Sequence, residues 1–155
     1  MSTSASSVAL DSVVAALREA FEADLVSVVL FGSAAEGTAR PLSDLNVLIV
    51  LRRFDRARAD RVRETLRTAE AGARLNAMFL LEDELPRAAE AFAVKFGDVL
   101  RRRRVVFGAD PLVGLKIPRQ AEIRRLQQVL LNLKLRLRWL YVVRSLREEQ
   151  AARVA

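Results

Sequence analysis

The chain has 155 residues, 52% hydrophobic and 29% charged, a length and composition typical of one folded domain. It contains no Cys and no His, which excludes thiol nucleophiles, serine triads with an imidazole base and Cys/His zinc sites. The net charge of +7 is uneven, because 15 basic and 5 acidic residues lie from Lys95 onward, a local charge of +10. We expect this basic part to attract nucleotides, nucleic acid, acidic proteins or anionic lipid.

The first residues lack the features of a targeting segment. The sequence "MSTSASSVALDS" has neither the basic start nor the long apolar core of a signal peptide. The longest apolar runs, such as Leu25 to Phe31, are far shorter than the roughly 20 residues of a membrane span. We therefore expect a cytoplasmic protein that does not enter a membrane.

A helix and two buried strands are the first predicted elements. An amphipathic helix is predicted by apolar residues at helical spacing, namely Leu10, Val13, Val14, Leu17 and Phe21. The segments Leu25–Phe31 and Leu45–Leu51 are almost wholly apolar, as expected of central strands. Between them, a short helical turn is expected to start at Ser33 and to be interrupted by Gly37 and Pro41.

Two helices and two strands are predicted next. A charged helix covers residues 54–73, with Phe54, Val62 and Leu66 facing inward and Gly72 ending it. Residues 74–81 predict a third strand, 82–103 a helix with an acidic start and a basic end, and 104–108 a short last strand.

The order of elements predicts an α/β domain over residues 1–110. Residues 111–155 form a helical extension, in which one long helix is expected from about Pro118 to Arg153.

Gly32 and Ser33 form a candidate phosphate-binding turn. They follow a buried strand and open a predicted helical turn, where free backbone N–H groups and the helix dipole favour an anion. Glycine lets the chain approach such a ligand closely. Ordinary strand-to-helix turns use the same two residues, so the dipeptide alone does not decide between the two interpretations.

The spacing around this turn resembles a known signature. Gly32-Ser33, ten residues, then Asp44-x-Asn46 on a buried strand is similar to the pattern of the DNA polymerase beta-like nucleotidyltransferase superfamily, in particular its minimal nucleotidyltransferase group. The resemblance covers about residues 10–108, and its specific part is Leu30–Leu51. It implies a small mixed sheet flanked by helices, a nucleoside triphosphate held by the Gly-Ser turn, and two Mg²⁺ ions bound by three aspartates.

The resemblance assigns roles to particular residues. Gly32 and Ser33 match the phosphate-binding turn, and Asp44 matches the first metal ligand. Asn46 stands where the family has a second aspartate, and Asn76 aligns with the third. The metal-binding and catalytic set is therefore Asp44 with two amides in place of carboxylates.

Loss of charge at these two positions predicts impaired catalysis. Two Mg²⁺ ions repel each other unless anionic ligands offset their charge, and three aspartates supply −3 whereas Asp44 alone supplies −1. An amide also cannot accept a proton from an acceptor hydroxyl. We expect metal-dependent transfer to be lost or very slow, while nucleotide binding survives with little or no Mg²⁺.

Several charged residues around the motif have two interpretations. Glu36 is the best substitute carboxylate because it lies near the turn, and the other candidates are Asp55, Asp60 and residues 82–84. Their alternative role is a solvated face or a favourable helix N-terminus. Phosphate could be bound by the flanking arginines, or these could be ordinary surface residues: Arg40, Arg52 and Arg53.

The basic run Arg101–Arg104 could grip a phosphate backbone. Successive helical residues point in different directions, however, and no aromatic residue is interleaved to stack on bases. Nucleic-acid binding is therefore the less favoured interpretation.

The long helix predicts a protein contact. Steps of four and three, the spacing of a helix–helix seam, separate the leucines Leu126, Leu130, Leu133, Leu137 and Leu140. Further apolar residues on other faces are Leu131, Leu135, Trp139 and Val142. Residues 118–153 are thus expected to pack on a second copy or another helical protein, or to fold back on the chain's own sheet. The resemblance implies a helical HEPN-type partner of a toxin–antitoxin pair.

Three functional hypotheses follow. The first is a nucleotidyltransferase-like domain that binds nucleotide and transfers it poorly or not at all. The second is a non-enzymatic antitoxin-like or scaffold protein acting through its C-terminal helix. The third is a weakly active Mg²⁺-dependent transferase that uses Asp44 with Glu36 or the two amides.

Overall fold

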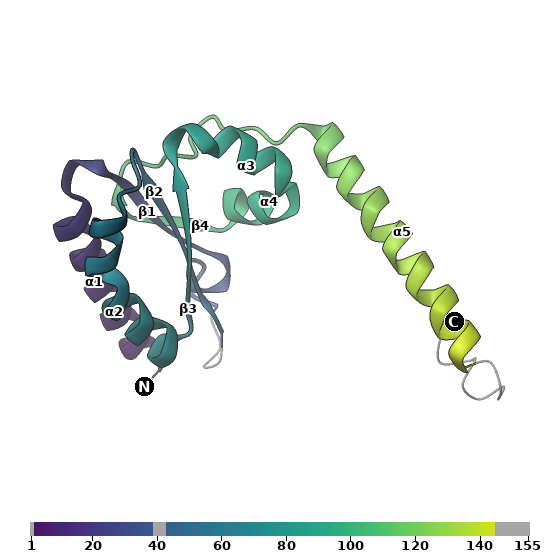
Figure 1. Ribbon diagram of the computed structural model, residues 1–155, viewed down its shortest axis with the longest axis horizontal. Coiled ribbons are helices and arrows are strands. Elements are labelled where there is room, and N and C mark those ends of the chain that lie inside the picture. The colour runs from purple at the N-terminus through teal and green to yellow at the C-terminus, as the bar shows by residue number, and fades with distance from the viewer. Residues whose placement is uncertain (1, 39–42, 145–155) are drawn as a thin grey trace. The chain divides into compact units, whose positions relative to one another are not determined.

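The computed structural model describes residues 2–38 and 43–144, and the chain forms two compact units, residues 1–116 and 117–155. The first is an α/β unit whose helices and strands, in chain order, are α1 (Ser2–Phe21), β1 (Leu25–Phe31), β2 (Leu45–Leu51), α2 (Arg56–Ala73), β3 (Leu75–Leu81), α3 (Leu85–Ala91), α4 (Ala93–Arg101) and β4 (Arg103–Gly108) (Figure 1).

The four strands form one mixed sheet in the order β3-β2-β1-β4. Strand β1 is antiparallel to both β2 and β4, whereas β2 and β3 are parallel. In register, Phe31 of β1 lies opposite Asn46 of β2, and Asn46 lies opposite Asn76 of β3. The predicted fold class, a small mixed sheet with flanking helices and a long C-terminal helix, is confirmed.

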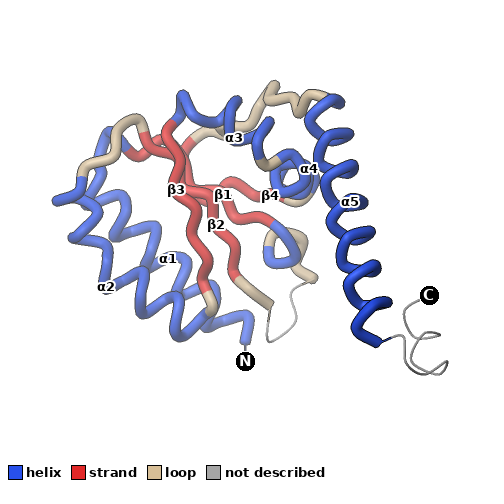
Figure 2. The backbone as a smooth tube through the Cα atoms, turned by 45° about the vertical axis from the view of Figure 1, so that its right-hand side comes forward, coloured by secondary structure: helices blue, strands red, loops and turns tan. Residues whose placement is uncertain are grey.

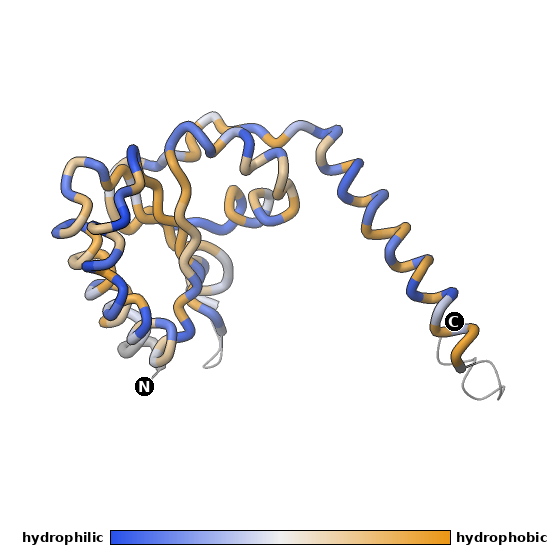
Figure 3. Tube along the Cα trace, in the orientation of Figure 1, coloured by the Kyte–Doolittle hydropathy of each residue, from blue (hydrophilic) through white to orange (hydrophobic). Residues whose placement is uncertain are grey.

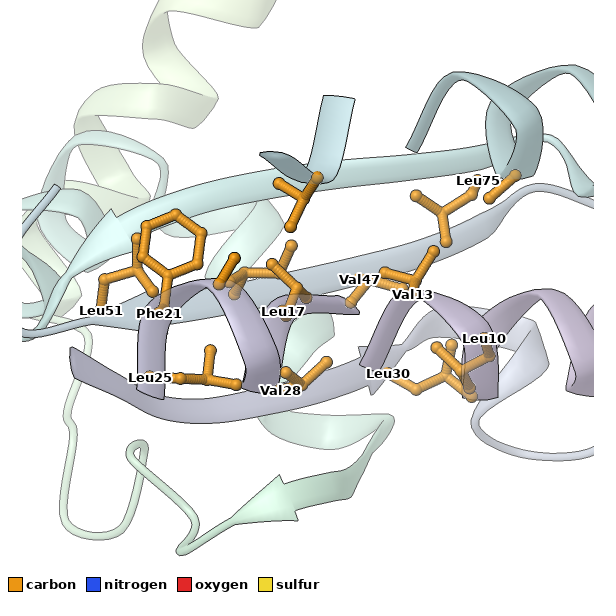
Figure 4. Close-up of a cluster of buried hydrophobic side chains, with 14 of the residues drawn as sticks. Leu10, Val13, Leu17, Phe21, Leu25, Val28, Leu30, Val47, Leu51 and Leu75 are labelled. Carbon is orange, nitrogen blue, oxygen red and sulfur yellow. The ribbon is translucent and has the colours of Figure 1, made fainter. Parts of the chain in front are cut away.

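One face of the sheet is closed by α1 and α2, which lie side by side along it (Figures 1 and 2). The helical spacing predicted for α1 is confirmed, since its apolar stripe points at the strands (Figure 4). The main cluster joins α1 residues Leu10, Val13, Leu17 and Phe21 to strand residues Leu25, Val28, Leu30, Val47, Leu51 and Leu75. Burial of this apolar surface is the main favourable term that holds the unit together.

Alternate strand residues point to the opposite face of the sheet, on the side where α3 and α4 lie (Figure 2). Fully or almost fully buried residues outside the first cluster include Val29 and Leu48 of the strands and Ala89, Phe96 and Val99 of the helices. At the starts of β2 and β3 on this face, Asn46 is half-buried and Asn76 is exposed.

Two local features fix β4 on the edge of β1. The buried Ser27 hydroxyl donates to the Phe107 carbonyl over 2.9 Å. Gly108 has φ +77°, and a Cβ at this position would lie 2.1 Å from the Val26 carbonyl oxygen. Only glycine combines this backbone conformation with this close approach.

Three predicted details are wrong. Phe54 does not face inward, because it precedes α2 and is 53% exposed, touching Phe79 edge to face. Gly72 does not end α2, which continues to Ala73 and is capped by Arg74 in a left-handed conformation. The helix predicted over residues 82–103 is a 3₁₀ turn (Glu82–Glu84) followed by α3 and α4, which are separated at Phe92 with φ −115° and ψ 44°.

The second unit contains the helix α5 (Arg119–Arg144), so the predicted long helix is present up to residue 144 and its expected remainder lies outside the described residues. Hydrophobic positions recur along the whole of α5 (Figure 3). Exposed apolar residues on it include Leu126, Leu130, Leu131, Leu133, Leu135, Leu137, Trp139 and Val142. No helix in the described parts of the chain combines the length and apolar character that crossing a membrane requires.

Candidate functional site

The two asparagines of the motif are direct neighbours across β2 and β3. Asn46 and Asn76 are register partners in a parallel pair, and register partners project to the same face. Phe31 is the antiparallel partner of Asn46, so the three side chains form one row across the sheet, on the face opposite α1 and α2. The fold thus brings together residues 30 positions apart in the sequence.

The Gly32-Ser33 turn borders this row. Gly32 has φ +78° and begins a 3₁₀ turn (Gly32–Ala34) directly after β1, close to the expected start at Ser33. Its N–H donates to the Arg102 carbonyl over 2.9 Å, which ties the turn to the end of α4. A Cβ on Gly32 would lie 3.7 Å from Asn46 Nδ2, so the turn passes within contact distance of the amide. A ligand bound at the turn would therefore lie beside Asn46.

Asp44 immediately precedes β2 and is bound by Arg74. Arg74 Nε donates to Asp44 Oδ1 over 2.8 Å, and both side chains are at least half exposed. The backbone of Arg74 is anchored twice: its N–H donates to Ala69 at the end of α2, and its carbonyl accepts from the Leu45 N–H over 3.1 Å. Its φ of +51° is uncommon for a residue other than glycine, so the surrounding contacts hold it there.

A hollow of about 570 Å³ adjoins these groups, a volume within the range of small-molecule sites. It lies around the start of β3 and is lined by Asp44, Leu66, Glu70, Arg74, Leu75, Asn76 and Ala77. Asp44 and Asn76 were predicted from the sequence, whereas Arg74 and Glu70 were not, because Arg74 is the C-cap of α2 and Glu70 lies in its last turn, and neither belongs to the motif.

Lys95 of α4 lies over the same row. Its Nζ is 5.9 Å from the centre of the Phe31 ring, within the range of a cation–π contact. Lys95 is not part of a recognisable sequence motif. Only the packing of α4 brings it to the site. With Arg74 it gives the row two cationic neighbours.

The remaining basic run is largely engaged in ion pairs. Arg102 binds Asp98 through Nε over 2.7 Å, and this hydrogen bond raises the pKa of Arg102 above its ordinary value. Arg103 binds Asp110 over 2.9 Å. These pairs stabilise the junction of α4 with β4. They also leave less positive charge for binding a phosphate backbone, the role predicted for the basic run.

The other predicted carboxylates have structural partners. Glu36 forms an ion pair with Arg102 over 3.6 Å, Asp55 caps α2 by accepting from the Arg58 N–H, and Asp60 pairs with Arg63. Glu84 accepts from the Leu81 N–H over 2.9 Å. Within the described ranges, no group of three or more carboxylates is arranged to hold a metal ion.

Of the flanking arginines, Arg53 binds Asp24 through two nitrogens, both over 3.2 Å. Arg40, predicted to contact the nucleotide, lies outside the described residues.

Comparison with known proteins adds to this geometry. A curated relative from Methanocaldococcus jannaschii, named "Putative protein adenylyltransferase", is 38% identical over 52 residues, which are 34% of this chain and 35% of the relative. This chain therefore matches only about a third of the length of that relative.

One solved structure shows the same fold. The spectinomycin adenyltransferase from Enterococcus faecialis, solved with ATP and spectinomycin, superposes with a TM-score of 0.64 at 16% identity, over 81% of this chain and 66% of that one. A toxin–antitoxin structure with AMP-PNP gives a TM-score of 0.43 at 13% identity, over 86% of this chain and 94% of that one, and this weaker likeness supports no conclusion.

The family itself is shown by the sequence. The nucleotidyltransferase domain family matches residues 10–107, which include the sheet, the Gly-Ser turn and all three motif positions Asp44, Asn46 and Asn76. The chain belongs to the nucleotidyltransferase domain family.

Proposed function

We propose that this protein is a nucleotidyltransferase-like domain that binds a nucleoside triphosphate and transfers the nucleotide poorly or not at all. Residues 1–110 carry this function, with Gly32 and Ser33 at the phosphates and Asp44 holding at most one Mg²⁺. The observation that carries the proposal is the register of Asn46 with Asn76 beside the Gly-Ser turn. This arrangement supports a site of the family's shape built around two uncharged side chains.

The donor set does not fit a pair of Mg²⁺ ions. Mg²⁺ is held by carboxylates together with substrate phosphates, and the aligned positions offer one carboxylate and two amides. The one carboxylate, Asp44, already accepts a hydrogen bond from Arg74. A metal pair at this site would be left largely uncompensated, which opposes two-metal transfer.

Retained shape supports binding. The turn keeps its left-handed glycine, and the hollow beside Asp44 and Asn76 has the volume of a small-ligand site. The names of the relatives suggest adenine as the nucleobase and a protein hydroxyl as the acceptor. We propose these two as the first to test.

The test is a transfer assay on the full chain. Wild type and the double variant Asn46→Asp/Asn76→Asp are incubated with α-labelled ATP, Mg²⁺ and a protein mixture that offers Ser, Thr and Tyr hydroxyls. Label on protein and released pyrophosphate are both measured. We expect the double variant to exceed wild type by at least about a hundredfold, the scale of removing one preorganised catalytic group.

The matched control is Asn132→Asp, which makes the same chemical change on α5 and should stay at the wild-type level. Measurable wild-type turnover equal to that of the double variant would contradict impairment, whereas no turnover in either would mean that the site has decayed beyond these two positions. If wild-type turnover is measurable and Asp44→Asn abolishes it, the protein is a weakly active Mg²⁺-dependent transferase instead.

A second candidate function is a scaffold or antitoxin-like role through α5. The observation that favours it is the row of exposed leucines at seam spacing, Leu126, Leu130, Leu133 and Leu137. The partner is either a second copy of the chain or another helical protein of the HEPN type.

Sedimentation of the full chain tests this second function. A dimer or larger species that becomes monomeric in Leu130→Glu/Leu133→Glu would support self-association through α5. The control Arg136→Glu changes charge on the same helix without removing a leucine. A monomer at all concentrations would exclude the homodimer and leave only a different helical partner.

A further inference from the structure

We propose that two cations of the chain, Arg74 and Lys95, take the place of the divalent metal ions, so that the site binds a triphosphate without Mg²⁺. The inference rests on the proposed nucleotide binding and names the groups that make it metal-independent. Its ligand class is a polyphosphate anion, as in a nucleoside triphosphate.

Arg74 is held where a metal bound to Asp44 would lie. Its Nε contacts Asp44 Oδ1 over 2.8 Å, and a guanidinium in this place neutralises the carboxylate as a cation would. This contact uses Nε and leaves the two terminal NH₂ groups, with four N–H donors, for another anion. Because Arg74 is anchored by its N–H and its carbonyl, the guanidinium is presented from a fixed backbone position.

Lys95 approaches the other end of the same row. Its ammonium lies over the ring of Phe31, the register partner of Asn46, and Phe31 immediately precedes Gly32. A contact with a ring face leaves the ammonium hydrogens able to donate to phosphate oxygens. The Gly-Ser turn and the row Phe31–Asn46–Asn76 thus lie between two positive groups, one from the end of α2 and one from α4.

The charges of these groups decide the preferred ligand. Asp44 and Glu70, which line the hollow with Arg74, contribute −1 each, and Arg74 and Lys95 contribute +1 each, so these four groups sum to zero. The three aspartates implied by the family resemblance would give −3, which attracts metal and repels a bare triphosphate. Amides at two of the three positions remove that repulsion. Each amide can also donate hydrogen bonds to phosphate through its NH₂ group.

One carboxylate opposes this arrangement from nearby. Glu70 of α2 lines the same hollow as Asp44, Arg74 and Asn76. Its charge offsets that of Arg74, and the four groups together still lack the excess negative charge of three aspartates.

The test measures binding of AMP-PNP to the full chain by calorimetry, in excess EDTA and in excess Mg²⁺. Wild type is expected to bind in EDTA with a Kd within about threefold of the value in Mg²⁺. Arg74→Gln and Lys95→Gln are each expected to weaken binding in EDTA by at least about tenfold, the effect of losing a charged hydrogen bond. Inorganic triphosphate should compete with AMP-PNP, and adenosine should not.

Matched variants separate the proposed role from a general effect. Arg67→Gln removes an arginine of α2 that pairs with Glu64, and Lys134→Gln removes a lysine of α5; both should bind as wild type does. Asn46→Asp/Asn76→Asp should bind weakly in EDTA and recover in Mg²⁺, because restored carboxylates need the metal. Thermal melting of each variant confirms that it is folded, which the exposed positions of Arg74 and Lys95 favour.

The outcomes are distinguishable. Binding of wild type only in Mg²⁺, or unchanged binding by Arg74→Gln and Lys95→Gln in EDTA, overturns the replacement of metal by these cations while nucleotide binding stands. Competition by adenosine but not by triphosphate overturns it too. No binding in either condition overturns both this inference and the proposed function.

Discussion

The two faces of the sheet use the same strands for opposite purposes. At the start of β2 and β3, Leu45 and Leu75 point into the closed core under α1 and α2, while their neighbours Asn46 and Asn76 point to the other side. The first set fixes the strands by burial, and this allows the second set to be polar and partly exposed. A site on such a sheet can change its side chains, and with them its chemistry, without changing its backbone.

The largest effect is expected on the closed face. Phe21→Ala removes a fully buried ring, and the lost burial and the resulting cavity should lower the free energy of unfolding by about 3–5 kcal/mol. Phe92→Ala is the control, because Phe92 is 60% exposed and should cost less than about 1 kcal/mol. Chemical denaturation measures both. Equal losses would show that the closed face is not the centre of stability.

The next effect concerns the strand edge that both faces share. Gly108→Ala places a Cβ against the Val26 carbonyl in a left-handed conformation, and should cost about 2–4 kcal/mol. Gly37 has a similar φ of +73° with open space around it, so Gly37→Ala should cost only about 1 kcal/mol. The difference in unfolding free energy isolates the close approach, and its absence would contradict the packing of β4 on β1.

A smaller effect is expected from Ser27, a buried polar residue on the face of the candidate site. Ser27→Ala removes the hydrogen bond to the Phe107 carbonyl and should cost about 1–2 kcal/mol. Ser12→Ala, at an exposed position of α1, should leave the unfolding free energy almost unchanged. If both variants melt like wild type, the Ser27 hydroxyl does not help to hold β4.

The site face should tolerate substitution. Asn46→Asp/Asn76→Asp places two like charges opposite each other across β2 and β3, which should cost at most about 1 kcal/mol in EDTA. Added Mg²⁺ should recover the melting temperature, and Asn132→Asp should respond to neither condition. A larger loss would mean that the two amides stabilise the sheet and are not a replaceable part of the site.

The smallest effect is a pH dependence at the far edge of the closed face. A hydrogen bond from Arg53, together with the charges of Arg53, Arg58 and Arg52, holds the pKa of Asp24 below its ordinary value of 3.8. Stability from this ionised carboxylate is complete above pH 3.8 and is lost as the pH falls through the lower folded-state pKa.

Asp24→Asn should therefore reduce the melting temperature at pH 7, and the difference from wild type should shrink toward pH 3. Melting curves across this range measure it. A difference that stays constant down to the lowest pH would mean that the Asp24 charge makes no contribution.

The sequence predicted most of the fold because apolar patterns dominate it. The ends of β1 and β2 were predicted to the residue, since continuous apolar runs flanked by Gly, Ser, Asp and Arg are unambiguous. The break at Phe92 was missed because no Gly or Pro marks it. Tertiary packing imposes that break, as Leu85 and Ala89 before it and Phe96 after it are all buried. The end of α2 was misplaced for a similar reason: contacts of Arg74 with Leu45 and Asp44 set it, not Gly72.

The candidate site could be predicted only in part. A motif with fixed spacing marks Gly32, Ser33 and Asp44 in the sequence. Arg74 and Lys95 reach the site from a helix cap and from α4, and neither position has a distinctive neighbour in sequence. Contacts of this kind depend on register and helix packing, which local patterns do not contain.

The side-by-side placement of Asn46 and Asn76 also bears on how such a site evolves. An asparagine codon becomes an aspartate codon by one base change, so each step toward a charged site is short. A first aspartate at either position would face an amide, which can donate a hydrogen bond to it, and would meet no like charge at the opposite position. Neither single step carries the repulsion of the pair, and a lineage can pass between the amide site and the carboxylate site in both directions without losing the fold.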